Sequence, residues 1–235
     1  MGTVGAADRR DFWIVLGAGL LPIIVANLAF AINVQQGLEA CIPYWDGCLS
    51  VSRGLRSGPG LVLFKVLALP STVLMWWAWS VVGARQWPPG AAVAGLRRVV
   101  WLGKLGSVFF LVYVLWLGTD GEIYRWLRRY GVVFYFGLTG LAHLMLLAQW
   151  ARHGAPRPAG KRVYFGVVLL MWAAGIGSAI KRKLIDDPQF LDRVENALEW
   201  HFALYLSLCF VALACALPGE KNGLHRDDRL SVDRP

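Results

Sequence analysis

Six long apolar stretches constrain the fold of this chain more than any motif does. They cover roughly residues 12–34, 60–84, 98–118, 130–150, 162–180 and 195–217. A helix needs about 20 mostly apolar residues to cross a bilayer, and each stretch reaches about that length. Together they take up most of the 235 residues and leave no room for a separate soluble domain. The sequence therefore predicts an all-α, polytopic membrane protein, a six-transmembrane-helix bundle over residues 1–218.

The distribution of charge agrees with a membrane protein and indicates an orientation. Only 17% of the residues are charged and 57% are hydrophobic, unlike a soluble domain of this length. The net charge of +9 comes from basic residues near the ends of the apolar stretches, as in the positive-inside pattern, so it requires no nucleic acid. We expect both termini in the cytoplasm and a disordered cytoplasmic tail at 219–235.

Two of the four cysteines lie in the first loop expected outside the membrane. Cys41 and Cys48 stand in CIPYWDGC, and such a loop faces an oxidising compartment in which a disulfide persists. Their spacing does not match zinc patterns, which use tighter pairs with further ligands, so we predict a disulfide and no metal site. Cys209 and Cys215 fall inside the last apolar stretch, where a thiol is an ordinary apolar side chain.

Ionisable residues inside the apolar stretches are costly in lipid, so each one calls for a partner or a role. Lys65 and Glu199 lie at a similar depth from the outer ends of their helices and have opposite charges. We predict an ion pair or a shared polar pocket in the outer half of the bundle, and a purely structural pair remains the alternative. His201 follows Glu199 by two residues, about 200° around a helix, so the two side chains point in nearly opposite directions.

His143 lies near the expected bilayer midplane, where a histidine is either a hydrogen-bonded packing residue or a functional group. Its depth differs from that of His201, so the two do not form a haem-binding pair, and we expect no cofactor. The chain has no G-x-S-x-G or H-E-x-x-H motif. A catalytic triad would have to be assembled in space, from Ser50 or Ser52 with His201 and Asp46.

Three segments, taken together, resemble the Frag/DRAM/Sfk family of membrane proteins. They are IPYWDGCLSVSRGLRSGPGLVLFKVLALP, GLTGLAHLMLLAQW and DRVENALEWHFALYLSLCF, and their order and the six-helix count agree with that family. Glu199 and Trp200 correspond to a Glu–aromatic pair that recurs in the family's last helix. Cys41 and Cys48 depart from the general pattern. The high Arg, Trp and Gly content indicates a bacterial member, located in the inner membrane.

The resemblance implies a protein that handles lipids, like the family branch that remodels the lipid of GPI anchors. A bacterium has no such anchors, so the ligand would be another phospholipid- or glycolipid-like molecule. Acyl transfer or hydrolysis would be the reaction class if the protein is an enzyme. We assign catalytic roles to Glu199, His201, His143 and Asp46, and substrate contacts to Lys65, Arg53, Tyr44, Trp45 and Ser52. The alternative is a non-enzymatic membrane organiser or accessory subunit that binds a lipid or a partner membrane protein.

Overall fold

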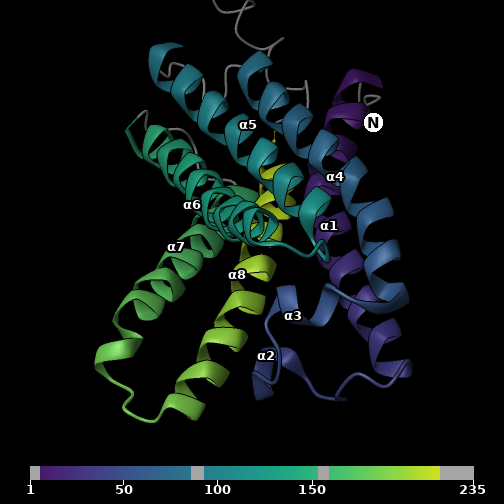
Figure 1. Ribbon diagram of the computed structural model, residues 1–235. Coiled ribbons are helices and arrows are strands. Elements are labelled where there is room, and N and C mark those ends of the chain that lie inside the picture. Colours follow the sequence, from purple (N-terminus) through teal and green to yellow (C-terminus); the bar gives the residue numbers. More distant parts are fainter. Residues whose placement is uncertain (1–5, 86–92, 153–158, 218–235) are drawn as a thin grey trace, which may run out of the picture.

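The structure is a computed structural model and describes residues 6–85, 93–152 and 159–217. The helices are α1 (Ala6–Gln35), α2 (Pro43–Asp46), α3 (Val51–Leu55), α4 (Gly58–Ala84), α5 (Val93–Trp116), α6 (Glu122–Arg152), α7 (Ala159–Ile180), the 3₁₀ turn η1 (Lys181–Lys183) and α8 (Pro188–Ala216) (Figure 1). Six helices in these ranges are long and apolar enough to cross a membrane, which confirms the predicted all-α, six-helix membrane fold. The tail predicted at 219–235 lies outside the described residues.

Helix starts at the loop side follow local residue chemistry. The Asp187 side chain accepts a hydrogen bond from the Gln189 backbone N–H at 2.9 Å, and Pro188 occupies the first turn of α8. An acidic cap satisfies a free N–H group, and proline at this position has no N–H left to satisfy. Gly118 and Gly121 have φ angles of 75° and 122°, which allow the tight turn between α5 and α6.

Among the six long helices, α6 and α8 begin farthest before the apolar stretches that predicted them. α6 begins at Glu122 and α8 at Pro188, several residues before the stretches at 130–150 and 195–217. Hydropathy alone misses these first turns because they carry charged residues, although the backbone is already helical. The extra turns place charged side chains of α6 and α8 on regular helical faces.

The six long helices form an arc in the order α6, α5, α4, α1, α8, α7, in which neighbours pack closely. α6 packs only sparsely against α7 and α8, so a seam lies between the two ends of this arc. α1 and α8 run antiparallel, because Gly19 lies against Phe210 while Phe30 lies against Trp200. The beginning of α1 and the end of α8 therefore share one end of the bundle, the terminal end.

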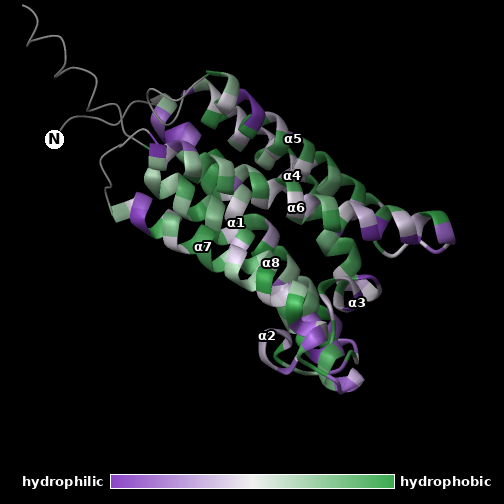
Figure 2. Ribbon diagram, turned by 90° about the vertical axis from the view of Figure 1, so that its left-hand side faces the viewer, coloured by the Kyte–Doolittle hydropathy of each residue, from purple (hydrophilic) through white to green (hydrophobic). Residues whose placement is uncertain are grey.

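The opposite end, which we call the loop end, carries residues 36–57 with α2 and α3, and the turns 117–121 and 181–187. Figure 2 shows hydrophobic helix bodies between hydrophilic segments at both ends, as expected for a protein that crosses a bilayer. At the terminal end, Arg85 forms ion pairs of 2.6 Å with Asp8 and 2.8 Å with Asp11. These contacts join the beginning of α1 to the end of α4.

Candidate functional site

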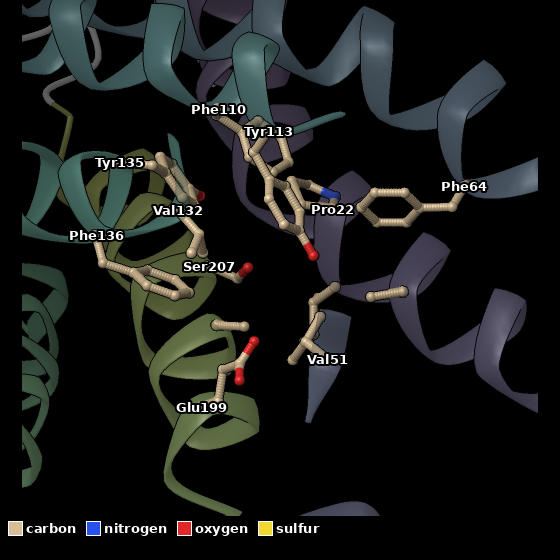
Figure 3. Close-up of a pocket in the computed structure, with 13 residues that line it drawn as sticks. Pro22, Val51, Phe64, Phe110, Tyr113, Val132, Tyr135, Phe136, Glu199 and Ser207 are labelled. Atoms are coloured by element: carbon tan, nitrogen blue, oxygen red, sulfur yellow. The ribbon is translucent and has the colours of Figure 1, made fainter. Parts of the chain in front are cut away.

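A narrow chamber of about 40 Å³ lies among α1, α3, α4, α5, α6 and α8 (Figure 3). This volume is far below the range of about 300–1,000 Å³ that is typical of sites for small ligands, so side chains fill most of the space. Aromatic rings form much of its wall, namely Phe64, Phe110, Tyr113, Tyr135 and Phe136. Glu199 supplies its carboxylate, and the chamber is therefore an apolar space with one acidic group at its edge.

A wider cavity of about 450 Å³, which we call the vestibule, shares Tyr113, Val132, Phe136 and Glu199 with the chamber. The two spaces therefore adjoin at these four residues. The vestibule also carries most of the charge, from Arg56, Arg125, Arg128, Arg129, Glu195 and Glu199. With four arginines and two glutamates, the walls of the vestibule carry a net positive charge.

Three of the vestibule arginines lie on one face of α6. Arg125, Arg128 and Arg129 are spaced i, i+3 and i+4, which brings side chains to the same side of a helix. Arg128 donates hydrogen bonds to the backbone carbonyls of Trp116 and Thr119, at the end of α5 and in the turn after it. Arg125 and Arg129 are exposed and form no ion pair with any described residue. Their guanidinium groups remain available to an anion.

Glu199 lies where the apolar and basic spaces meet. Ser52 of α3 lines the vestibule together with Glu199, and Tyr113 of α5 lines both spaces with it. Figure 3 shows the carboxylate directed toward the space between Val51, Tyr113 and Ser207. The carboxylate therefore lies at the boundary that the two spaces share.

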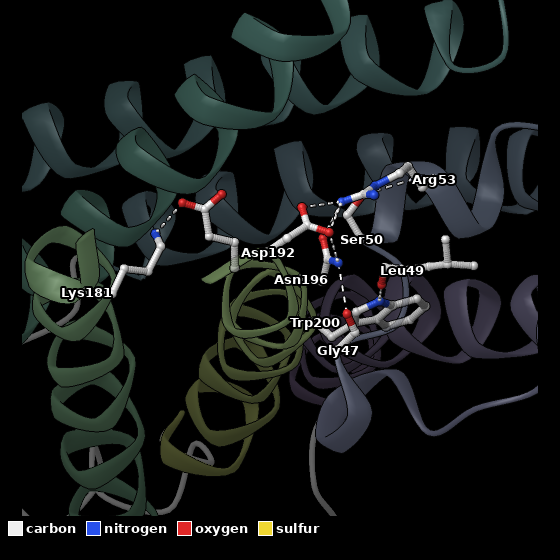
Figure 4. A network of polar contacts seen from close by, with 9 residues as sticks. Gly47, Leu49, Ser50, Arg53, Lys181, Asp192, Asn196 and Trp200 are labelled. Carbon is white, nitrogen blue, oxygen red and sulfur yellow. Dashed lines mark hydrogen bonds and ion pairs between the residues drawn. The ribbon is translucent and has the colours of Figure 1, made fainter. Parts of the chain in front are cut away.

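The loop that carries α2 and α3 is fastened to α8 by a polar network, which we call the outer clamp (Figure 4). Arg53 donates to Asp192 and to Asn196, each at 2.8 Å. The buried Asn196 side chain donates to the Gly47 carbonyl at 2.8 Å, and the Trp200 indole donates to a second loop carbonyl at 2.9 Å. The clamp fixes the position of α3, and α3 presents Ser52 and Arg56 to the vestibule.

The predicted Cys41–Cys48 disulfide is present in this loop. Between its cysteines, the Tyr44 hydroxyl accepts a hydrogen bond from Asn27 at 2.8 Å, and its ring contacts Trp200 with centroids 5.3 Å apart. Burial raises the pKa of Tyr44, so its hydroxyl stays protonated at neutral pH. The disulfide and this aromatic contact hold α2 against α1 and α8.

The predicted site residues separate into two groups. Ser52 and Glu199 line the vestibule, as expected of a shared site. Lys65 lines neither cavity and forms no ion pair with Glu199 in the described chain, because α4 packs against α1 and α5 and directs Phe64 inward instead. The predicted contact of Arg53 with a ligand is replaced by its bonds to α8 in the outer clamp.

Three further residues that the sequence placed in the site line neither the chamber nor the vestibule. Trp45 is 87% exposed, and Asp46 accepts a hydrogen bond from the Ile42 backbone N–H at 2.7 Å. His201 bonds the Ala197 carbonyl at 2.9 Å and packs edge-on against Tyr44, so it lines neither the chamber nor the vestibule. The divergence predicted between His201 and Glu199 is therefore observed.

The structure does not assemble the triad considered from the sequence. No described hydrogen bond joins Ser50 or Ser52 to His201, or His201 to Asp46. The Ser50 hydroxyl instead accepts from the Arg53 backbone N–H at 3.2 Å and caps α3. Ser50, Asp46 and His201 each bond a backbone group a few residues away, which explains their positions.

His143 is fully buried in the half of the bundle nearer the terminal end. Its Nδ1 lies 2.8 Å from the Tyr164 hydroxyl, and its ring packs on Trp79 and Phe210 with centroids 4.9 and 4.8 Å away. It lines neither the chamber nor the vestibule. The contacts therefore favour the packing role among the two roles that the sequence left open.

Sequence reasoning missed the aromatic wall and the arginines of the vestibule. Arg125, Arg128 and Arg129 lie before the apolar stretch at 130–150, although their spacing in YRWLRRYG matches one helical face. The inward positions of Tyr113 and Tyr135 had no such signal, because most residues around them are apolar too. Within the described ranges, no group of three His, Cys, Asp or Glu side chains is placed to hold a metal ion.

Known proteins were compared with this chain in three ways. No protein-family model, no curated protein and no solved structure matches it. The resemblance to the Frag/DRAM/Sfk family therefore stays a prediction that rests on the three segments alone. What the structure establishes is a six-helix membrane protein in which an apolar chamber opens to a basic vestibule beside Glu199.

Proposed function

We propose that this protein binds an anionic lipid in the vestibule, with the phosphate at its arginines and an acyl chain along its apolar wall. The observation that carries the proposal is that one cavity of ligand size combines arginines with apolar side chains such as Val133, Leu198 and Phe202. An amphiphilic molecule is the chemical class that matches both. Arginine suits this role because its planar guanidinium binds phosphate oxygens through two parallel hydrogen bonds.

The orientation predicted from the basic residues fits this proposal. With both termini in the cytoplasm of a bacterial inner membrane, the loop end and the vestibule would face the periplasm. The disulfide between Cys41 and Cys48 supports this orientation, since it lies at the loop end and disulfides persist in oxidising compartments. The lipid would then come from the periplasmic leaflet.

The position of Glu199 favours a second, catalytic version of the same proposal. A lipid held in this way places its ester groups between tail and phosphate, at the level of Glu199. Hydrolysis would use the Glu199 carboxylate as a general base that takes a proton from the attacking water. Water would add to the ester carbonyl, and the products would be a fatty acid and a lysolipid. The non-enzymatic alternative is a lipid-binding organiser in which Glu199 only contacts the bound molecule.

The binding proposal is tested by removing the two unpaired arginines of α6. Native mass spectrometry would measure the apparent Kd of the full-length protein for dioleoyl phosphatidylglycerol and dioleoyl phosphatidylcholine. We expect Arg125→Gln with Arg129→Gln to weaken phosphatidylglycerol binding about tenfold or more, since a hydrogen bond to a charged group contributes about 1.5–3 kcal/mol. Binding of phosphatidylcholine, which has no net charge, should change less.

A matched control removes two positive charges from a part of the protein outside the two cavities. Arg97 and Arg98 are exposed residues near the beginning of α5 and line neither cavity. Arg97→Gln with Arg98→Gln should leave phosphatidylglycerol binding close to the wild-type value. Equal losses in both double variants would overturn the proposal, because they would show a response to net charge alone.

The catalytic version is decided separately with Glu199→Gln, an isosteric change. Release of fatty acid by the wild-type protein, abolished in this variant while the Kd stays unchanged, would support chemistry at the site. No release by the wild-type protein with tight binding would exclude hydrolysis and leave the binding role.

A further inference from the structure

The seam between α6 and the α7–α8 hairpin has a distinct geometry at the loop end. α6 and α7 meet toward the terminal end, where Tyr164 bonds His143 and Gly140 lies 3.4 Å from Met171. Toward the loop end they separate: a side chain at Gly137 of α6 or at Gly177 of α7 would meet open space. Figure 2 shows the tip of the α5–α6 hairpin apart from the loop-end segments of α7 and α8.

The vestibule lies along this seam. Its walls include Val132 and Val133 of α6, Ser178 of α7, and Leu198 and Phe202 of α8. A space bounded by membrane-crossing helices that do not close on one another is open sideways. Side chains next to the seam are apolar and exposed, with Val133 at 56% and Ile176 at 61%, so they suit contact with acyl chains.

The vestibule arginines of α6 lie at the loop end of the seam, not at its centre. Arg125 and Arg129 belong to the first two turns of α6, at the loop end, where phosphate groups of a bilayer leaflet are located. Farther along the helices, Phe136 of α6 and Phe202 of α8 line the vestibule with tilted rings whose centroids lie 6.0 Å apart. Polar and apolar groups are thus ordered along the seam as head and tail are ordered in a lipid of the leaflet.

We propose that the seam is a lateral portal through which a lipid of the loop-end leaflet enters the vestibule tail first. This inference rests on the proposed lipid-binding function. It specifies the ligand as a membrane-resident lipid that slides sideways between α6 and α7, with its phosphate moving along the arginines. Its acyl chain then lies along the apolar wall formed by Val133, Leu198 and Phe202.

The test closes the portal with a covalent bridge. Val133→Cys and Ser178→Cys place one thiol on each side of the seam, in a Cys215→Ser background that removes the exposed native thiol. A bismaleimide bridges the pair in the full-length protein in phosphatidylglycerol vesicles. We expect exchange of long-chain phosphatidylglycerol into the site to slow by about tenfold or more, because the bridge obstructs both the entry and the exit of the lipid.

Two controls separate the portal from a general disturbance. The double-cysteine protein without the bridge, and each single-cysteine protein labelled with a monofunctional maleimide, should exchange lipid at nearly the wild-type rate. Dihexanoyl phosphatidylglycerol, a water-soluble short-chain lipid, should still bind the bridged protein, since it can reach the vestibule from the aqueous side.

The outcomes distinguish the portal from the function on which it rests. Unchanged exchange of the long-chain lipid in the bridged protein would overturn the portal and leave lipid binding intact. Binding of neither lipid to the unbridged protein would overturn the proposed function itself. Loss of both lipids on bridging alone would also contradict the portal, because it would show that the bridge collapses the vestibule.

Discussion

Replacing Asn196 with alanine tests whether the outer clamp holds the loop that supports the site. The Asn196 side chain is 3% exposed, donates to the Gly47 carbonyl and accepts from Arg53, both at 2.8 Å. The substitution removes one neutral hydrogen bond, worth about 1 kcal/mol, and one to a charged group, worth about 1.5–3 kcal/mol. It also leaves the Gly47 carbonyl without this partner. We therefore expect the free energy of unfolding to fall by about 2–4 kcal/mol.

The assay is reversible unfolding of the purified protein in mixed micelles, followed by far-UV circular dichroism. Asp192→Ala provides the comparison, because it removes the Arg53–Asp192 ion pair, in which the Asp192 side chain is 55% exposed. An exposed ion pair contributes only about 0–1 kcal/mol, so this variant should be much less destabilised. Equal and small losses in both variants, below about 0.5 kcal/mol, would refute the clamp as the element that positions α3.

Two further predictions concern residues that the sequence placed in the site and the structure places outside it. Lys65→Met should leave phosphatidylglycerol affinity unchanged in the same mass-spectrometric titration, because Lys65 lines neither cavity; a tenfold loss would show that the lysine contacts the ligand. His143→Phe should lower the free energy of unfolding by about 1–3 kcal/mol, since it removes the 2.8 Å contact with Tyr164 inside the core. It should not alter lipid affinity, and lost binding with unchanged stability would contradict its packing role.

Much of the fold could be predicted from the sequence because crossing a bilayer imposes a length and a composition. Nearby residues determine the six apolar stretches and the cap at Asp187. The disulfide between Cys41 and Cys48 follows from two cysteines in one loop that faces an oxidising compartment. The first turns of α6 were missed because charged residues there interrupt the apolar pattern. Local chemistry therefore accounts for the elements, although not for their exact ends.

The site was less predictable, since depth along a helix does not determine which neighbour a side chain faces. Lys65 and Glu199 share a depth, yet α4 and α8 lie on different sides of α1 in the arc. Glu199 was found because a carboxylate within an apolar stretch requires a role. Its actual surroundings, Tyr113 and the arginines of α6, depend on packing between distant segments, and no spacing in the chain encodes that.

The most direct test of the account is the structure of the protein determined by electron cryo-microscopy in nanodiscs that contain phosphatidylglycerol. We predict density for one lipid that crosses the seam, with an acyl chain along the apolar wall of the vestibule and phosphate oxygens within hydrogen-bonding distance of Arg125 or Arg129. The ester region of that lipid should lie beside Glu199. A vestibule without lipid density, with lipid only around the outside of the bundle, would contradict the account.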